Sequence, residues 1–201
     1  MNAASVFMLA GLALSPLLSA QAVELNDQFS LLITPTLVSD YRANGLSQTK
    51  GDPAAQLAVT LSHASGLYAG IWTSNVNFGY GSKARQEIEY YAGYAWQISD
   101  SISLDTFYTR YEYPRESGYN QSDVQTVLDV YGVLLGGKYV TNMQGPGYED
   151  ENGEFHKGKK DEDLSTFFIG YHTLLPAEFG LQVRYEYVDY KDDVFFSDSG
   201  K

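Results

Sequence analysis

Charged side chains stand at alternate positions in several segments whose composition otherwise favours β-strands. Side chains of a strand alternate between its two faces, so charges two residues apart share one face. Six residues of this kind are Glu87, Glu89, Asp105, Asp129, Arg184 and Glu186. If that face lines a closed barrel, the lumen is acidic on balance and favours cations or neutral polar solutes. If the barrel is narrow, the same charges fill its interior and pair with one another.

The opposite faces of these segments are apolar. Ile88, Tyr90, Tyr94 and Trp96 alternate with the polar residues of 87–98, and strict alternation predicts a β-strand with one apolar and one polar face. Nine strands are predicted in this way, at residues 28–41, 54–63, 66–78, 87–98, 101–112, 123–133, 137–142, 164–173 and 180–190. The faces of 66–78 are not assigned, because both are apolar.

The connections between the predicted strands alternate in length. Short ones, such as 99–100 and a predicted turn at 134–137, follow every second strand, and longer polar ones, such as 42–53 and 142–163, follow the others. Outer-membrane barrels have short turns on the periplasmic side and long loops outside. We therefore expect an all-β, antiparallel up-and-down transmembrane β-barrel. Strands of about ten residues match a tilted span of the bilayer.

The first 22 residues have the pattern of a secretory signal peptide. An apolar stretch at 5–20 runs into Ala20-Gln21-Ala22, which is typical of a cleavage site. This predicts a cleaved signal at 1–22, export, and a barrel domain at 23–201 in the bacterial outer membrane.

The predicted number of strands is odd, whereas bacterial single-chain barrels have an even number. The chain also ends in Ser-Gly-Lys rather than in an aromatic closing strand. We therefore expect a C-terminally incomplete domain that lacks the last strands of a barrel of about 10–12 strands. If 123–142 is divided wrongly, eight strands would close instead.

Composition excludes several functions. There are 25 acidic and 13 basic residues, with a net charge of −12, so a face for nucleic acid is not expected. The absence of cysteine excludes disulfides and thiolate metal sites. His63, His156 and His172 do not converge in the predicted barrel, so we expect no enzyme, cofactor or metal site. The acidic residues of 150–154 lack the full spacing of a calcium loop and predict a solvated loop.

Residues 39–76 carry a more specific pattern, SDYRANGLSQT, then PAAQ, then GLYAGIWTSNV. The pattern resembles the hallmark of the TorF-type porin family (Gcw_chp) of proteobacterial outer-membrane proteins. The matching residues are Tyr41, Arg42, Gly45, Ser47, Gln48, Thr49, Pro53, Ala54, Gln56, Gly66, Tyr68, Gly70, Trp72, Ser74 and Asn75. The resemblance covers most of the chain and implies an outer-membrane barrel with a porin function.

The loop at 42–53 has two interpretations. In one, it folds into the lumen or over its mouth, with Arg42 and Gln48 as polar contacts. In the other, it is a structured turn in which Gly45 and Gly51 supply positive φ angles and Pro53 starts the next strand.

Three function classes follow from the sequence: a narrow passive pore for small polar solutes, a non-conducting barrel with a structural or surface-binding role, and a soluble, exported lipocalin-like barrel. They differ in the direction of the apolar face. Tyr90 and Trp96 point outward in a membrane barrel and inward around a ligand in a lipocalin. The expected partners are outer-membrane lipid, lipopolysaccharide and small polar solutes.

Overall fold

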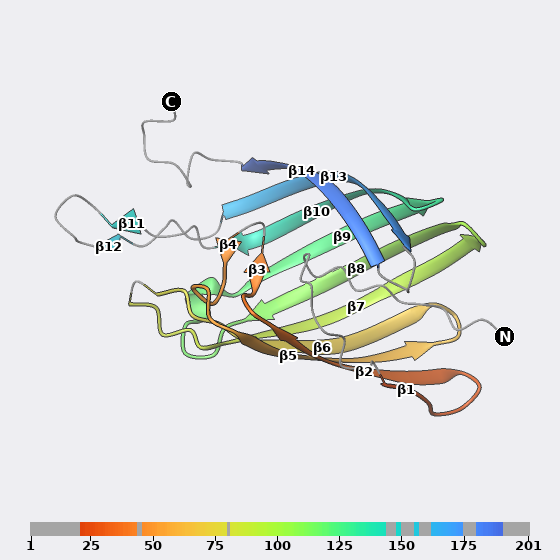
Figure 1. The fold of residues 1–201 in the computed structure, drawn as a ribbon, viewed down its shortest axis with the longest axis horizontal. Helices are drawn as coiled ribbons and strands as arrows, with labels where there is room; N and C mark the ends of the chain where they lie inside the picture. The colour runs from red at the N-terminus through yellow and green to blue at the C-terminus, as the bar shows by residue number, and fades with distance from the viewer. Residues whose placement is uncertain are drawn as a thin grey trace.

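The computed structural model describes residues 21–43, 46–79, 81–143, 148–149, 155–156, 162–174 and 180–190. Ten strands form one antiparallel sheet, curved in Figure 1, in which each strand pairs with the next one along the chain. These strands are β1 (Gln21–Glu24), β2 (Phe29–Val38), β5 (Ala54–His63), β6 (Leu67–Asn75), β7 (Gln86–Ser99), β8 (Ile102–Glu112), β9 (Gln121–Val130), β10 (Val133–Met143), β13 (Glu162–Leu174) and β14 (Gly180–Tyr190).

Two small hairpins and one helical turn lie in the longer connections. They are β3 (Arg42–Ala43) with β4 (Leu46–Ser47), β11 (Tyr148–Glu149) with β12 (Phe155–His156), and the 3-10 helix η1 (Ser117–Tyr119). All of them lie at one end of the sheet in Figure 1, which we call the long-loop end. The opposite end, the short-turn end, carries the tight connections, so the predicted alternation of short and long loops is confirmed.

The expected count of nine strands is wrong, because β1 was not predicted. It pairs with β2 between Gln21 and Ile33 and between Glu24 and Ser30. Residues 21 and 22 of β1 fall inside the predicted signal peptide, and the two that remain, Val23 and Glu24, are too few to show the alternation of a strand. The odd number that suggested missing strands therefore does not hold for the described sheet.

The predicted turn at 134–137 is also wrong. These residues belong to β10. The turn between β9 and β10 is formed by Tyr131 and Gly132, which have φ angles of 53° and 84°. Two consecutive positive φ angles are the geometry of the tight hairpin turns that match the twist of the strands. Glycine usually marks a turn, so the pair Gly136-Gly137 predicts one, although both residues lie within β10.

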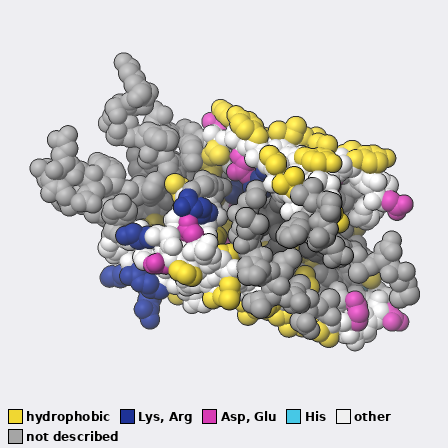
Figure 2. All heavy atoms as spheres, in the orientation of Figure 1, with side chains coloured by type: hydrophobic (Ala, Val, Ile, Leu, Met, Phe, Trp, Pro, Cys, Tyr) yellow, Lys and Arg dark blue, Asp and Glu magenta, His cyan; other side chains and the backbone are white. Residues whose placement is uncertain are grey.

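The apolar residues of the strands lie on the exposed face of the sheet, which we call the outer face. Tyr90, Tyr94 and Trp96 of β7 are 45%, 43% and 51% exposed. The corresponding residues of the other strands are also exposed, among them Leu57, Leu61, Ile71, Phe167, Ile169, Val183 and Tyr185. Figure 2 shows hydrophobic side chains along the sides of the sheet. The alternation predicted from the sequence is confirmed. Among the described residues, no helix is long and apolar enough to cross a membrane.

The other face, which we call the inner face, carries aromatic rings that lie across glycines of the neighbouring strand. The directly paired residues are Tyr91 with Gly70, Tyr68 with Gly93, and Phe168 with Gly136. A Cβ atom at position 136 would lie 2.3 Å from Cζ of Phe168 and 2.6 Å from the carbonyl oxygen of Thr126. Gly136 is therefore required by close approach of the ring and not by a turn.

Gly136 and Gly137 form a matched pair for testing this packing. We expect Gly136→Ala to lower the free energy of unfolding by about 1–3 kcal/mol, because the new methyl group displaces Phe168. Gly137→Ala should change it by less than about 0.5 kcal/mol, since the nearest atom to its Cβ is 3.4 Å away. Denaturant midpoints of the refolded proteins measure the difference. Equal losses in both variants would contradict the role assigned to Phe168.

Candidate functional site

The six residues predicted to line a lumen all lie on the inner face, as their registers require. They do not form one cluster. Glu87 and Glu89 lie near the long-loop end of β7, whereas Asp129 and Arg184 lie toward the short-turn end. The shared face was therefore predicted correctly, and the grouping within it comes from the tertiary structure.

Five residues from four segments meet near the long-loop end of the inner face: Glu87, Glu89, Tyr111, Tyr113 and Asp123. We call them the acid–tyrosine cluster. The hydroxyl of Tyr113 donates to Glu87 Oε1 at 2.9 Å, and that of Tyr111 donates to Asp123 Oδ2 at 2.8 Å. Glu89 pairs across the sheet with Tyr111. Glu87 is only 3% exposed, so its carboxyl group depends on the hydrogen bond from Tyr113.

Two oxygens of the acid–tyrosine cluster, Glu87 Oε2 and Asp123 Oδ1, are buried and have no hydrogen-bond partner among the described residues. Lys138 of β10 attracts Glu89 and Asp123. Burial first, and then the neighbouring Glu87, raises the pKa of the Tyr113 hydroxyl well above its ordinary range. Tyr113 therefore remains a hydrogen-bond donor at every physiological pH.

Four polar residues of this region were not predicted: Tyr111, Tyr113, Asp123 and Lys138. Tyr111 lies on the same face as Asp105 by alternation. Asp123 lies on the same face as Asp129 by simple alternation, so its position could have been found. The face of Lys138 was not predicted, because the turn expected at 134–137 interrupts the alternation of β10 just before this residue. Tyr113 follows the last residue of β8, where alternation no longer says which way a side chain points.

The remaining predicted lumen residues each have a direct partner on the inner face. Asp105 accepts a hydrogen bond from Tyr68 Oη at 2.8 Å, and Asp129 lies 2.5 Å from His172 Nε2. Arg184 forms an ion pair with Glu186, and its guanidinium also lies over the ring of Phe168. These charges pair internally, as expected for a narrow interior.

Aromatic side chains pack between the acid–tyrosine cluster and the centre of the inner face. Trp72, Tyr68 and Tyr91 are buried together with Ala58. Tyr41, from the loop after β2, packs its ring edge-on against Trp72 with centroids 5.5 Å apart. Tyr41 also contacts a second apolar cluster above, formed by Val76, Ala84 and Tyr113. The interior is thus densely packed at the long-loop end.

The loop that inserts Tyr41 is held by the carboxylate of Asp40. Asp40 Oδ1 accepts hydrogen bonds from Ser47 Oγ at 2.5 Å and from Thr49 Oγ1 at 3.1 Å. Arg42 Nε forms an ion pair with Asp40 Oδ2 at 2.6 Å. Thr49, which is almost fully buried, also accepts from the backbone N–H of Tyr41. The described residues of this loop are therefore held in one structure, in agreement with the structured-turn interpretation, and the loop also packs Tyr41 against the inner face.

Gln48 contacts the loop itself, whereas the side chain of Lys50 lies beside Gly79 of the β6–β7 loop. Gln48 Nε2 donates to the carbonyl of Leu46, and Gly51 has the expected positive φ of 85°. Lys50 also has a positive φ, of 59°, which was not predicted. Gly45 lies outside the described residues.

The rest of the hallmark pattern joins β5 to β6. Asn75 accepts from the backbone N–H of Ala55 at 2.8 Å and donates to the carbonyl of Pro53 at 3.1 Å. Gln56 Nε2 donates to Ser74 Oγ at 3.3 Å. These residues fix where β5 begins, and hence how the loop carrying Tyr41 meets the sheet.

The histidines and acids give no metal-binding arrangement in the described part of the chain, where no group of three potential ligands is suitably placed. His63 lies on the outer face against Phe29, and His172 lies on the inner face. The side chain of His156 and the acidic segment 150–154 lie outside the described residues.

The chain belongs to the Gcw_chp family of bacterial proteins of unknown function, whose sequence model matches residues 26–191. Neither the curated proteins nor the solved structures contain a match. The matched range includes nine of the ten strands of the sheet, from β2 to β14.

The Asp40 carboxylate gives a pH-dependent prediction. The hydrogen bond from Ser47 lowers the pKa of the Asp40 carboxyl group below the ordinary 3.8. Partial desolvation of the carboxylate raises this pKa, and the contacts with Thr49 and Arg42 lower it further. Because the folded pKa is depressed, this carboxylate stabilises the loop above about pH 4, and the contribution is lost as pH falls through the lowered value.

We therefore expect hydrogen exchange in 39–53 to accelerate below pH 4, and Asp40→Asn to exchange quickly already at neutral pH. Asp52→Asn is the control, because the described residues show no hydrogen bond to its side chain. Identical pH profiles for the wild type and Asp40→Asn would contradict the role of Asp40.

The Tyr113–Glu87 bond gives a stability prediction. Tyr113→Phe leaves a buried carboxylate without its donor and should lower the free energy of unfolding by about 1–3 kcal/mol. Tyr90→Phe removes an exposed outer-face hydroxyl and should change it by less than about 0.5 kcal/mol. Denaturant titration compares the two. If the losses are the same, the Glu87 carboxylate does not depend on Tyr113.

Proposed function

We propose that this protein is an outer-membrane β-barrel that admits small polar solutes, with a preference for cations, through a narrow acidic lumen. The observation that carries the proposal is the distribution of side chains across the sheet. Exposed apolar residues cover most of the outer face, which also holds the ion pair of Arg110 and Glu112 near its long-loop end, and most charged residues of the strands lie on the inner face among its aromatic rings. This is the arrangement of a barrel in lipid and the reverse of a lipocalin-like barrel, in which apolar side chains surround a ligand.

Strand length supports the same proposal. The strands of the ten-stranded sheet from β5 onward have between 9 and 14 residues, and about 9–11 tilted residues cross the hydrocarbon layer. In this proposal the long-loop end lies outside the cell and the short-turn end lies in the periplasm, as in outer-membrane barrels with short periplasmic turns. Export through the predicted signal peptide is part of this proposal, as is closure of the barrel.

The identity of the lumen charges supports a preference for cations. Glu89 faces Lys138 but also has Glu87 and Asp123 nearby. The inner face around the acid–tyrosine cluster therefore carries three acidic side chains and one basic side chain, and this excess of acidic groups favours a positive solute over a negative one.

The dense packing around Trp72, Tyr68 and Tyr91 favours a second candidate, a non-conducting barrel with a structural or surface-binding role. Interiors of barrels with about eight strands are filled by side chains, whereas about sixteen leave an open channel. A described sheet of ten strands is close to the filled limit, so conduction decides between the two candidates.

The test is to refold the full chain into lipid and measure its heat-modifiable gel mobility and its single-channel conductance. We expect a heat-modifiable band and small conductance steps that favour cations. Glu89→Gln should reduce the cation-to-anion permeability ratio by at least about two-fold, since one lumen charge is lost. Asp100→Asn, an exposed change at the short-turn end, is the control and should leave the ratio unchanged.

A heat-modifiable barrel without conductance would reject the pore and leave the non-conducting barrel. A protein that stays in solution and does not insert into bilayers would reject both candidates.

A further inference from the structure

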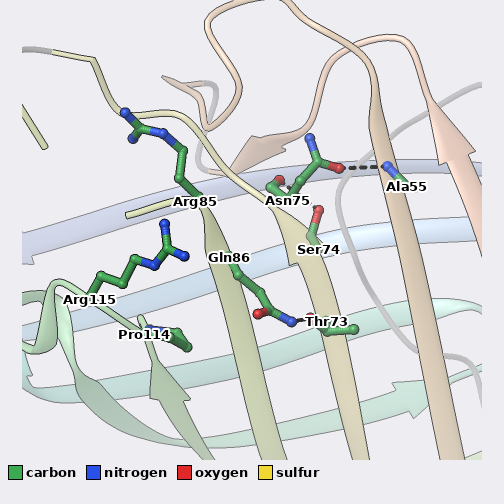
Figure 3. A pocket seen from close by; sticks show the side chains of 8 residues that line it. All are labelled: Ala55, Thr73, Ser74, Asn75, Arg85, Gln86, Pro114 and Arg115. Atoms are coloured by element: carbon green, nitrogen blue, oxygen red, sulfur yellow. Dashed lines mark hydrogen bonds between the residues drawn. The ribbon is translucent and has the colours of Figure 1, made fainter. Parts of the chain in front are cut away.

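A polar pocket lies on the outer face at the long-loop end, directly above the apolar surface. Figure 3 shows its lining: Ala55, Thr73, Ser74, Asn75, Arg85, Gln86, Pro114 and Arg115. Its volume is about 400 Å³. The next outer-face residues down the strands are Leu57, Ile71 and Ile88. The pocket therefore marks the boundary between the apolar surface and the polar loops.

Two arginines from different loops supply the positive charge of this pocket. Arg85 lies just before β7 and is held in place by two hydrogen bonds from its Nη1, to the carbonyl of Ser82 at 2.9 Å and of Ala84 at 2.6 Å. Arg115 extends toward the same space from the β8–β9 loop (Figure 3). Among the described residues, no carboxylate lines the pocket. The neighbouring acids have partners outside it: Glu116 accepts a hydrogen bond from the backbone N–H of Lys83, and Glu112 forms an ion pair with Arg110.

The backbone at Arg115 is an independent observation. Pro114 and Arg115 occupy the centre of a turn closed by a hydrogen bond from Glu116 N to Tyr113 O at 3.0 Å. Arg115 has a φ of 76°, at a position where turns with a preceding proline normally carry glycine or asparagine. A bulky residue with positive φ is strained. Such strain persists where the surrounding structure fixes it and is concentrated at functional sites.

The turn is fixed from both sides. Tyr113 N donates to Asn120 Oδ1 at 2.9 Å, and the backbone N–H of Lys83 donates to Glu116 Oε2 at 2.7 Å. The second bond ties the β8–β9 loop to the β6–β7 loop, which carries Arg85. The two arginines are therefore held at a set separation by backbone contacts and not by each other.

We propose that this pocket binds a lipid-borne phosphate, the lipid A phosphate of lipopolysaccharide in the outer leaflet. The inference rests on the proposed membrane location and identifies the lipid contact of that barrel. Guanidinium groups bind phosphate oxygens in paired, charge-assisted hydrogen bonds. The apolar surface below the pocket offers a place for acyl chains, while the phosphate reaches the arginines at the rim.

The charge distribution at the two ends of the sheet supports this choice of partner. Described connections at the long-loop end contain five basic residues, Arg42, Lys50, Lys83, Arg85 and Arg115, and four acidic ones, Asp40, Asp52, Glu116 and Glu149. The tight turns of the opposite end contain Asp27 and Asp100. In Figure 2, the Lys and Arg side chains gather toward the long-loop end. In an overall acidic chain, this places basic groups at the end that faces an anionic outer leaflet.

The test uses the full chain refolded into lipid and three variants: Arg85→Gln, Arg115→Gly and Lys83→Gln. Bound lipopolysaccharide after washing is measured by native mass spectrometry, with phosphorylated and enzymatically dephosphorylated lipopolysaccharide as probes. Arg115→Gly is chosen because glycine relieves the strained φ, so that this variant should fold at least as stably as the wild type. Lys83→Gln removes the same charge from the same rim without touching the pocket lining.

We expect Arg85→Gln and Arg115→Gly each to weaken binding of phosphorylated lipopolysaccharide by about 10-fold, the effect of one charge-assisted contact. Lys83→Gln should change it by less than about two-fold. Dephosphorylated lipopolysaccharide should bind all proteins equally weakly, and millimolar inorganic phosphate should not displace the lipid.

The other outcomes overturn the inference in distinguishable ways. If the wild type inserts into lipid but all four proteins bind lipopolysaccharide equally, the phosphate site is wrong and the membrane proposal stands. If inorganic phosphate competes fully, the ligand is a soluble anion and not a lipid. If the wild type does not insert into lipid, the membrane proposal and the lipid site both fail.

Discussion

The alternation of side chains across an extended backbone is the constraint on which the other features of this protein depend. It sends Tyr90, Tyr94 and Trp96 to the outer face and Glu87 and Glu89 to the inner face of the same strand. A shift of one residue in any pairing would exchange the two faces. The continuous registers from β2 to β14 therefore keep an apolar surface facing outward over nearly the whole sheet.

The inner face accommodates both large aromatic rings and acidic side chains. Large rings fit there because glycines lie opposite them, as Gly136 does for Phe168. Carboxylates are tolerated because tyrosine hydroxyls, which bring both a donor and an apolar ring, lie beside them, as Tyr113 lies beside Glu87. A buried acid without such a donor would be costly. Tyrosine thus serves packing and hydrogen bonding together, in keeping with its abundance in the chain.

Residues 39–76 define the long-loop end. Asp40 fixes the loop that inserts Tyr41 above Trp72, and Asn75 fixes the start of β5. The inner side of this end is closed by aromatic contacts, while its outer side carries the pocket with Arg85 and Arg115. One short region of sequence therefore shapes both the mouth of the proposed lumen and the rim of the proposed lipid contact.

The sequence by itself determined the all-β class, the face of each clear strand and the rhythm of the loops, because these follow from a local period of two residues. It also placed Glu87, Asp105 and Arg184 on one face. It could not place the β9–β10 turn, since Gly136 serves a ring contact that local patterns do not reveal. Only the tertiary structure decided that Tyr113 meets Glu87 and that Arg85 meets Arg115 across one pocket. Such contacts join residues far apart in the chain, and their geometry depends on how loops cross the end of the sheet.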